Sequence, residues 1–140
     1  MQQYLPPRGA GVLCHISSLP NKYGIGSLGK EAYEFVDTLA KYGAKYWQIL
    51  PLQQTGYGDS PYQSVSCTSG NPYFIDLVDL HKQGLLDKEE LKSAERKLKN
   101  DIDYGDLYVN RYKLLRRAYA RFNVKNPDFV AFIESGEAEE

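Results

Sequence analysis

The chain has 140 residues, of which 42% are hydrophobic and 13% aromatic, so it can form one hydrophobic core and does not have the composition of a disordered tail. Lys and Arg together number 17 and Asp and Glu number 18, so no overall positive field exists to attract nucleic acid or an anionic membrane. No apolar run has the length of a signal peptide or approaches the ~20 residues that cross a bilayer, and we therefore expect a cytoplasmic protein.

A strand, a helix and a second strand are predicted in the first fifty residues. Residues 10–16 form a nearly continuous apolar run, which is typical of a strand buried on both faces. Residues 28–42 carry apolar side chains at helical spacing, with Ser27 as the predicted N-cap and Gly43 as the left-handed residue that follows the helix. Residues 46–50 are rich enough in aromatic and β-branched side chains for a strand. This order predicts parallel neighbouring strands, as in an α/β barrel or an open α/β sheet.

The next segment, residues 51–73, is a long connection without helical or strand periodicity. It is rich in Gly, Pro, Ser, Asp and Asn, and it also contains several tyrosines that can anchor it. Connections of this length are either functional or disordered, and the aromatic anchors favour an ordered pocket wall or lid.

Helices are predicted to dominate the remainder of the chain. Asp87 and Glu90 form a capping-box pattern at the start of a helix that extends towards Asn100. A second helix is predicted around residues 107–121, and a third begins near Pro127. No strand follows the third helix, so we expect this chain to be a piece of a longer domain.

A glycine motif precedes the first predicted helix. The segment Gly24-Ile-Gly-Ser-Leu-Gly29 matches the G-x-G-x-x-G pattern of dinucleotide-binding folds. In those folds the glycines follow the first strand directly and an acidic residue ends the second strand, whereas here loop residues intervene and the second strand ends in Gln-Ile-Leu-Pro. We therefore interpret these glycines as turn residues.

A basic face on the last long helix is a candidate for contacts with nucleic-acid phosphates. It consists of Lys113, Arg116, Arg117 and Arg121. Acidic residues are frequent at the same end of the chain and the formal net charge is −1, so a solvated helix face is the favoured interpretation. We expect no nucleic-acid partner.

Histidines and cysteines give little indication of chemistry. Cys14 and Cys67 have no second metal-binding side chain at zinc-ligand spacing, and neither histidine is accompanied by a nucleophile pattern. His81 lies in a predicted helix and is expected at the surface. His15 lies at the end of the first strand, where the site of an α/β barrel is found. We expect no metal and no organic cofactor.

The densest chemistry lies in the loop Gly56-Tyr-Gly-Asp-Ser-Pro-Tyr-Gln-Ser-Val-Ser, which follows the second predicted strand. Flat aromatic rings alternate there with short hydrogen-bonding side chains. A sugar needs both, because its C–H faces pack on rings and its hydroxyls must be paired when they leave water. Taken singly, Asp59 and Asn71 could be turn residues and the tyrosines core residues. Together they favour a sugar-contacting loop.

The sequence of this loop resembles the signature of the 4-α-glucanotransferase family, also called amylomaltases or disproportionating enzymes. The resemblance is carried by GYGDSPYQSVSCTSGNPYFIDL, and also by RGAGVLCHISSLPNKYGIGSLG, YEFVDTLAKYGAKYWQILPL and DYGDLY, up to about Phe122. It implies an α/β fold, namely the N-terminal part of a (β/α)8 TIM barrel with a helical insertion. It also implies transfer of α-1,4-glucan segments to other glucans or to glucose by a retaining double displacement.

The resemblance also assigns roles to residues of the loop. Tyr62 is expected against the sugar ring at the cleavage site, and Tyr57 and Tyr108 are expected to face glucan further out. Three further residues are expected to shape the pocket: Asp59, Ser60 and Gln63. Asp59 has no companion carboxylate within the loop and is not expected to be the nucleophile.

The resemblance implies a division of the chain into two parts of one barrel domain. Residues 1–76 are expected to form the first strand-helix-strand unit with the substrate loop, and residues 77–140 a helical insertion. The nucleophile and the acid are expected beyond residue 140, so this piece alone should be inactive. Two alternatives stay open, a non-catalytic glucan-binding module and a helical interaction module.

Overall fold

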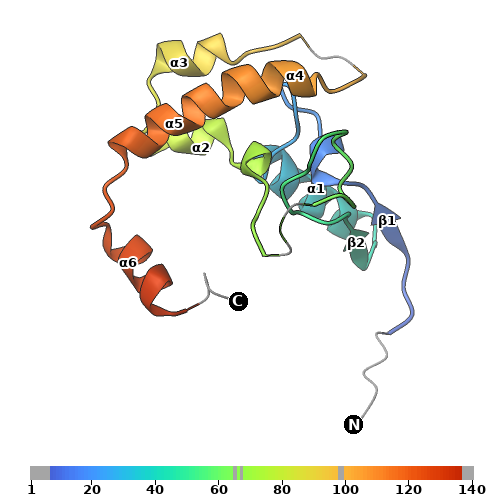
Figure 1. Ribbon diagram of the computed structural model, residues 1–140. Coiled ribbons are helices and arrows are strands. Elements are labelled where there is room, and N and C mark those ends of the chain that lie inside the picture. The colour runs from blue at the N-terminus through green and yellow to red at the C-terminus, as the bar shows by residue number, and fades with distance from the viewer. Residues whose placement is uncertain (1–6, 65, 67, 98–99, 137–140) are drawn as a thin grey trace.

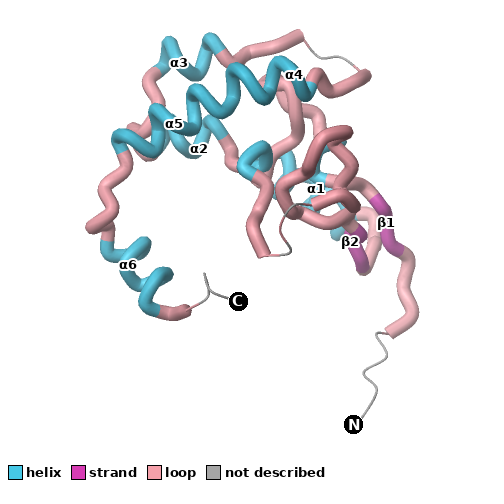
Figure 2. Tube along the Cα trace, in the orientation of Figure 1, coloured by secondary structure: helices cyan, strands magenta, loops and turns pink. Residues whose placement is uncertain are grey.

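The computed structural model describes residues 7–64, 66, 68–97 and 100–136, so Cys67 lies outside the described residues. A short sheet and the first helix lie at one side of the molecule and the later helices at the other (Figures 1 and 2). The elements in chain order are β1 (Gly11–Leu13), the 3-10 turn η1 (Ile16–Ser18), α1 (Lys30–Lys41), β2 (Tyr46–Gln48), the 3-10 turn η2 (Pro72–Phe74), α2 (Leu77–Lys82), α3 (Lys88–Ser93), α4 (Tyr104–Asp106), the π turn η3 (Leu107–Arg111), α5 (Tyr112–Arg121) and α6 (Pro127–Glu134).

The two strands β1 and β2 pair in parallel, which confirms the predicted strand order. Gly11 is opposite Tyr46, and the register continues to the pair of Leu13 and Gln48. The expectation that the first strand is buried on both faces is wrong for this chain, because Leu13 is 60% exposed and Val12 is 40% exposed. Within the described residues the sheet has these two strands, so no further strand covers their outer edge.

Helix α1 follows the prediction in position but begins differently. Gly29 occupies the N-cap position and no side chain caps the helix. The predicted N-cap, Ser27, is wrong because its hydroxyl donates a hydrogen bond of 2.6 Å to the buried carboxylate of Asp76 instead. Gly43 has a φ of +76°, which confirms the predicted left-handed residue after the helix.

The core consists of two clusters. One lies among α2, α3 and α5, and the other lies below the loop that follows β2. The first cluster contains Tyr23, Leu77, Leu86, Ala94, Leu114 and Ala118. The second contains Ile16, Ile25, Tyr73, Phe74 and Leu107. The second cluster therefore gives the loop its support.

The later helices differ from the sequence predictions at three points. The capping box of Asp87 and Glu90 is confirmed, but α3 ends at Ser93 instead of continuing towards Asn100, and residues 98–99 lie outside the described residues. The helix predicted around residues 107–121 begins with the π helix η3 and is α-helical from Tyr112. His81 is half-buried, and its Nδ1 lies 2.8 Å from the carbonyl oxygen of Leu86. In the part of the chain described here, every helix is too short or too polar to span a membrane.

The basic face of α5 is used partly inside the protein, so the interpretation as a purely solvated face is incomplete. Arg121 donates to the carboxylate of Glu90 with an Nη2–Oε1 distance of 3.1 Å, and Arg117 donates to the same oxygen at 3.3 Å. The Glu90 side chain is only 8% exposed and also accepts the backbone N–H of Asp87. The Arg121 hydrogen bond, followed by that of Asp87, lowers the pKa of Glu90 to about 2.

This ion pair predicts a pH-dependent stability. The experiments below use the full-length protein, which is the complete gene product that contains these residues. In the full-length protein, Glu90→Gln is expected to lower the midpoint of thermal unfolding at neutral pH by a few degrees. The unfolded chain protonates Glu90 near its ordinary pKa of about 4.3, whereas the folded chain does so only near 2. The stabilisation is therefore complete above about pH 5 and is lost as the pH falls towards 2.

The measurement is the difference in unfolding midpoint between wild type and Glu90→Gln from about pH 7 to about pH 3.5. We expect this difference to shrink as the pH falls. Glu95→Gln is the matched control, because Glu95 pairs with Lys22 at 2.7 Å but both side chains are exposed. A difference that stays constant over this pH range would contradict the role of the Glu90 carboxylate.

Candidate functional site

The loop that follows β2 is held closed at its base by isolated antiparallel bridges. Gln53 is bridged to Gly70, and Thr55 is bridged to Ser64. These pairings give backbone partners to part of a segment that has no regular secondary structure of its own. The loop of residues 51–70 is therefore a folded projection that begins at the C-terminal end of a strand.

The tip of the loop is a hydrogen-bonded turn. The N–H of Gly56 donates to the carbonyl of Gln63 at 3.0 Å. The N–H of Gln63 donates to the carbonyl of Ser60, also at 3.0 Å. Two successive residues are left-handed, Gly58 with φ +99° and Asp59 with φ +55°. Gly adopts this conformation freely and Asp tolerates it better than most residues, so the Gly-Asp pair explains why the chain turns here.

The turn presents its tyrosines to solvent. Tyr57 is fully exposed and Tyr62 is 73% exposed, so both rings are free to receive a ligand. The N–H of Tyr62 lies 3.4 Å from the hydroxyl of Ser60, which accepts its hydrogen bond and helps to hold this part of the turn. Gln63 contributes through the backbone bonds of the turn, and its side chain is exposed. Tyr108, on η3, is 69% exposed.

Asp59 lies at the wall of a small cavity of about 140 Å³ between the loop and the end of β1. His15 lines the same cavity and is buried, with its ring edge against Phe74 at a centroid distance of 5.3 Å. The N–H of Leu50 donates to His15 Nδ1 at 3.3 Å. Burial lowers the pKa of His15, so the ring is neutral at pH 7 and its proton lies on Nε2. The other polar residues that line the cavity are Ser17, Ser18, Gln53, Thr55, Asn71 and Tyr104.

A cluster of tyrosines joins the loop to the helical half of the protein. The rings of Tyr73 and Tyr112 have centroids 5.4 Å apart, and those of Tyr108 and Tyr112 lie 5.7 Å apart, edge to face. Tyr104 packs on Tyr73 at 6.2 Å. The hydroxyl of Tyr112 accepts a hydrogen bond of 3.1 Å from the side-chain amide of Gln54. Tyr108 is thus connected to the loop through one intervening ring.

The hydroxyls of Tyr73, Tyr104 and Tyr112 stay protonated at neutral pH. Burial, followed by electrostatic interactions with neighbouring groups, of which Tyr112 is the first, raises the pKa of Tyr73 to about 12. Asp59 is among these groups, and it also adds to the effect of burial that raises the pKa of Tyr104. Asp59 and the protonated phenol of Tyr104 line the same cavity.

The sequence interpretation named the residues of the turn but not the residues around them. Tyr104, Tyr108 and Tyr112 follow one another at four-residue spacing, which places side chains on one helix face, and this pattern could have identified the cluster. His15 was noted for its place at the end of a strand, and the structure brings it to the cavity that Asp59 lines.

Within the described part of the chain, the site holds no pair of carboxylates. Among the described residues that line the cavity, Asp59 is the one carboxylate. The carboxylate of Asp76 is engaged elsewhere, by the hydroxyl of Ser27 and the N–H of Asp79. The described residues also contain no group of three or more His, Cys, Asp or Glu side chains that could hold a metal ion. What the site offers is exposed aromatic rings on an ordered turn.

Most of the chain is similar to known proteins. Residues 14–139 match the family model described as 4-alpha-glucanotransferase. This chain belongs to the 4-α-glucanotransferase family. A 4-alpha-glucanotransferase of Clostridium butyricum is 56% identical over 122 residues, which cover 86% of this chain and 25% of the relative. The enzyme of Thermus thermophilus is 44% identical over 133 residues, covering 91% of this chain and 26% of that protein.

The structural comparison agrees with the sequence comparisons. Amylomaltase from Streptococcus agalactiae, solved in complex with acarbose, superposes on this chain with a TM-score of 0.83 and 39% sequence identity. The match covers 95% of this chain and 27% of that structure. The chain therefore spans about a quarter of the length of the relatives it matches.

Proposed function

We propose that the full-length protein is a 4-α-glucanotransferase that transfers segments of α-1,4-glucans to other glucans or to glucose. The observation that carries this proposal is the exposure of Tyr62 and Tyr57 on an ordered turn that begins at the C-terminal end of a parallel strand. Active sites of α/β barrels are built from loops at that end of the strands. The family membership of residues 14–139 supports the same reading.

The strand pair and α1 are the beginning of a (β/α)8 barrel in this proposal, and residues 77–140 are a helical insertion in the same domain. The parallel pairing of β1 and β2 across α1 supports the barrel, because a barrel repeats this unit. The exposed apolar side chains of β1 also support it, since further strands and helices would cover them.

Within the site, Tyr62 lies against the sugar ring at the cleavage point. An aromatic face contacts the C–H groups of a glucose ring, and its exposure leaves the face free for that contact. Ser60 and Gln63 hold the turn through the hydrogen bonds described above, and the N–H of Asp59 donates to the carbonyl of Gly56 at 3.2 Å; together the three residues shape the pocket. Tyr57 and Tyr108 contact glucan units farther from the cleavage point. Acarbose, a glucan analogue present in the solved amylomaltase, supports an oligosaccharide as the ligand.

The reaction is a retaining double displacement. A carboxylate attacks the anomeric carbon while an acid protonates the leaving oxygen, and the 4-hydroxyl of a second glucan then displaces the enzyme carboxylate. Both carboxylates come from parts of the full-length protein outside the 140 residues. The loop contributes binding and orientation, which lower the barrier by holding the glucan in a reactive position. The reaction needs no metal or organic cofactor, and a cytoplasmic location remains a prediction.

The test is incubation of the full-length protein with maltotriose. Transfer releases glucose and produces longer chains while the total number of reducing ends stays constant, because each broken linkage is replaced by a new one. Hydrolysis would raise the number of reducing ends with time. A protein that forms no longer chains, with or without added glucose as acceptor, would contradict the proposal. Activity is expected to be unchanged after exhaustive dialysis against EDTA.

A further inference from the structure

His15 carries a hydrogen-bond donor that the described part of the protein does not use. The side chain is only 9% exposed, and its Nδ1 accepts the N–H of Leu50 at 3.3 Å. Burial lowers the pKa of His15, so the ring is neutral at pH 7, and its one hydrogen is on Nε2 because Nδ1 is an acceptor. Among the described residues, Nε2 has no hydrogen-bond partner. One N–H of a nearly buried ring is therefore free.

This donor is open to a ligand. The described side-chain nitrogen and oxygen atoms that are both unpaired and closed off from solvent belong to Arg111, so Nε2 of His15 is accessible. His15 lines the cavity of about 140 Å³ between the loop and the end of β1. The Leu50 hydrogen bond and the edge-to-face contact with Phe74 hold the ring in one orientation. The donor is thus oriented before a ligand arrives, which lowers the cost of binding.

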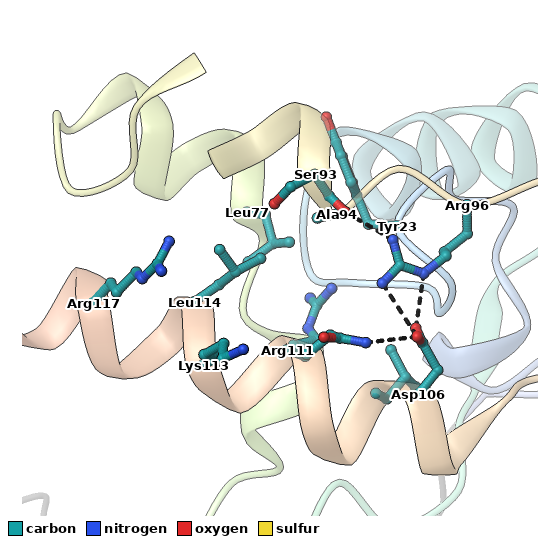
Figure 3. A pocket seen from close by; sticks show the side chains of 12 residues that line it. Tyr23, Leu77, Ser93, Ala94, Arg96, Asp106, Arg111, Lys113, Leu114 and Arg117 are labelled. Atoms are coloured by element: carbon teal, nitrogen blue, oxygen red, sulfur yellow. Dashed lines mark hydrogen bonds and ion pairs between the residues drawn. The ribbon is translucent and has the colours of Figure 1, made fainter. Parts of the chain in front are cut away.

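The larger cavity of about 310 Å³ between α5 and the end of α3 has no comparable donor in its buried arginine. Figure 3 shows the guanidinium of Arg111, the last residue of η3, pointing towards Ala94 and Leu77. Its Nη2 donates to the carbonyl of Ile75 at 2.6 Å, and its Nε and Nη1 are unpaired among the described residues but closed off from solvent. Atoms that water cannot reach are also out of reach of a ligand. His15 is therefore the stronger indication of a ligand site.

The opposite hydrogen-bonding requirement comes from Asp59, which lines the same cavity as His15. Its carboxylate accepts no hydrogen bond from the described residues, so it is available as an acceptor. An anionic ligand would be repelled by this carboxylate, and an ammonium group has no lone pair to accept the His15 N–H. A hydroxyl group satisfies both residues, because it donates one hydrogen bond and accepts two. The cavity therefore favours a neutral ligand that carries hydroxyls.

We propose that His15 is a glucan-binding residue, which donates its Nε2–H to a hydroxyl of the glucose unit that enters this cavity. The inference rests on the proposed function and adds a residue to its site. The cavity volume is several times the ~30 Å³ share of one water, which suits one sugar unit and not a chain. Pro61 also lines the cavity and directly precedes Tyr62, so the cavity adjoins the turn that presents the Tyr62 ring.

Three variants of the full-length protein separate the free donor from the other contacts of the ring. His15→Gln keeps an N–H donor at a similar reach but loses the acceptor for the Leu50 N–H. His15→Met has a similar length and keeps neither group. His15→Asn places an oxygen near the position of Nδ1, where it can accept from Leu50, but is too short to replace Nε2. All three lose the ring contact with Phe74 equally.

We expect His15→Gln to stay within about threefold of the wild-type kcat/KM for maltotriose, and His15→Met and His15→Asn to lower it by about tenfold. The loss arises because the sugar hydroxyl leaves water without regaining a hydrogen bond. A purely structural role through Leu50 predicts the other order, with His15→Asn the most active of the three. If His15→Asn does not fold, the comparison of His15→Gln with His15→Met decides, because both lack the Leu50 bond.

His81→Met is the matched control, because it removes the second histidine of the chain. His81 is half-buried on α2, its Nδ1 lies 2.8 Å from the carbonyl oxygen of Leu86, and it does not line the cavity. Its kcat/KM is expected to equal that of wild type.

The midpoint of thermal unfolding without glucan tests for a protein partner of the donor elsewhere in the full-length protein. Such a partner would be left unpaired in His15→Met, which would then unfold at a lower temperature than His15→Gln. We expect His15→Met to be at least as stable as His15→Gln, because the partner of the donor is the sugar.

The proposal is overturned if the three variants have equal kcat/KM, if His15→Asn is the most active, or if His15→Met is less stable than His15→Gln. Each of these results leaves the proposed function intact as long as the wild type forms longer chains. A wild type that forms none contradicts the proposed function, and calorimetric titration with maltotriose then decides on His15 by the same order of affinities. Absence of saturable maltotriose binding to such an inactive wild type would overturn both proposals.

Discussion

Replacing Tyr62 with alanine in the full-length protein is expected to lower kcat/KM for maltotriose by about a hundredfold. The ring is 73% exposed and contributes little to the core, so its removal leaves the fold intact and removes a surface on which a glucose ring packs. Tyr62→Phe retains the aromatic face and is expected to stay within about threefold of wild type. The measurement is the initial rate of glucose release from maltotriose at several substrate concentrations.

Tyr119→Ala is the matched control for this experiment. Tyr119 is 74% exposed, nearly the same as Tyr62, but it lies on α5, a helix, and not on the loop. Its loss should leave kcat/KM unchanged. If Tyr62→Ala kept at least half of the wild-type kcat/KM, the loop would not contact the sugar at the reacting position and the assignment of Tyr62 would be wrong.

Local sequence patterns were sufficient for the elements whose signals are local. The apolar spacing of the first helix, the left-handed Gly43 and the Asp87–Glu90 capping box all involve neighbours within a few residues, and the structure contains each of them. Ser27 was misjudged because its partner, Asp76, is 49 residues away. A capping serine accepts a backbone N–H with its hydroxyl oxygen, whereas the hydroxyl of Ser27 accepts from the side-chain amide of Asn21 at 3.2 Å and donates to the carboxylate of Asp76.

In the candidate site, too, local sequence patterns identified some residues, and residues placed by tertiary contacts were not identified. Position after a strand and alternation of aromatic and polar residues pointed to the turn that contains Asp59 and Tyr62. The same reasoning did not bring His15 and Asp59 to one cavity, because that depends on the tertiary fold of the loop after β2. It also did not identify Arg111 as buried, because the π turn that directs it inward leaves no recognisable pattern in the sequence.

The second large effect concerns the glycine motif before α1. A Cβ at position 26 would lie 1.9 Å from the carbonyl oxygen of Ile16 and 3.0 Å from the N–H nitrogen of Leu19, both backbone atoms. The segment around Gly26 packs backbone against backbone on residues 16–19, and the N–H of Gly26 donates to the carbonyl of Ser17 at 3.2 Å. Gly26→Ala is therefore expected to destabilise the full-length protein by about 3 kcal/mol, because the overlap cannot be relieved by rotating a side chain.

Urea unfolding of the full-length protein, followed by tyrosine and tryptophan fluorescence, measures this change. Gly105→Ala is the control, because it lies in α4, where the nearest atom to an added Cβ is 3.5 Å away, and alanine there should be neutral or stabilising by about 0.5 kcal/mol. Equal stabilities of Gly26→Ala and wild type would mean that the two segments do not approach so closely. The expected loss instead assigns Gly26 to close packing against the backbone of η1 and Leu19.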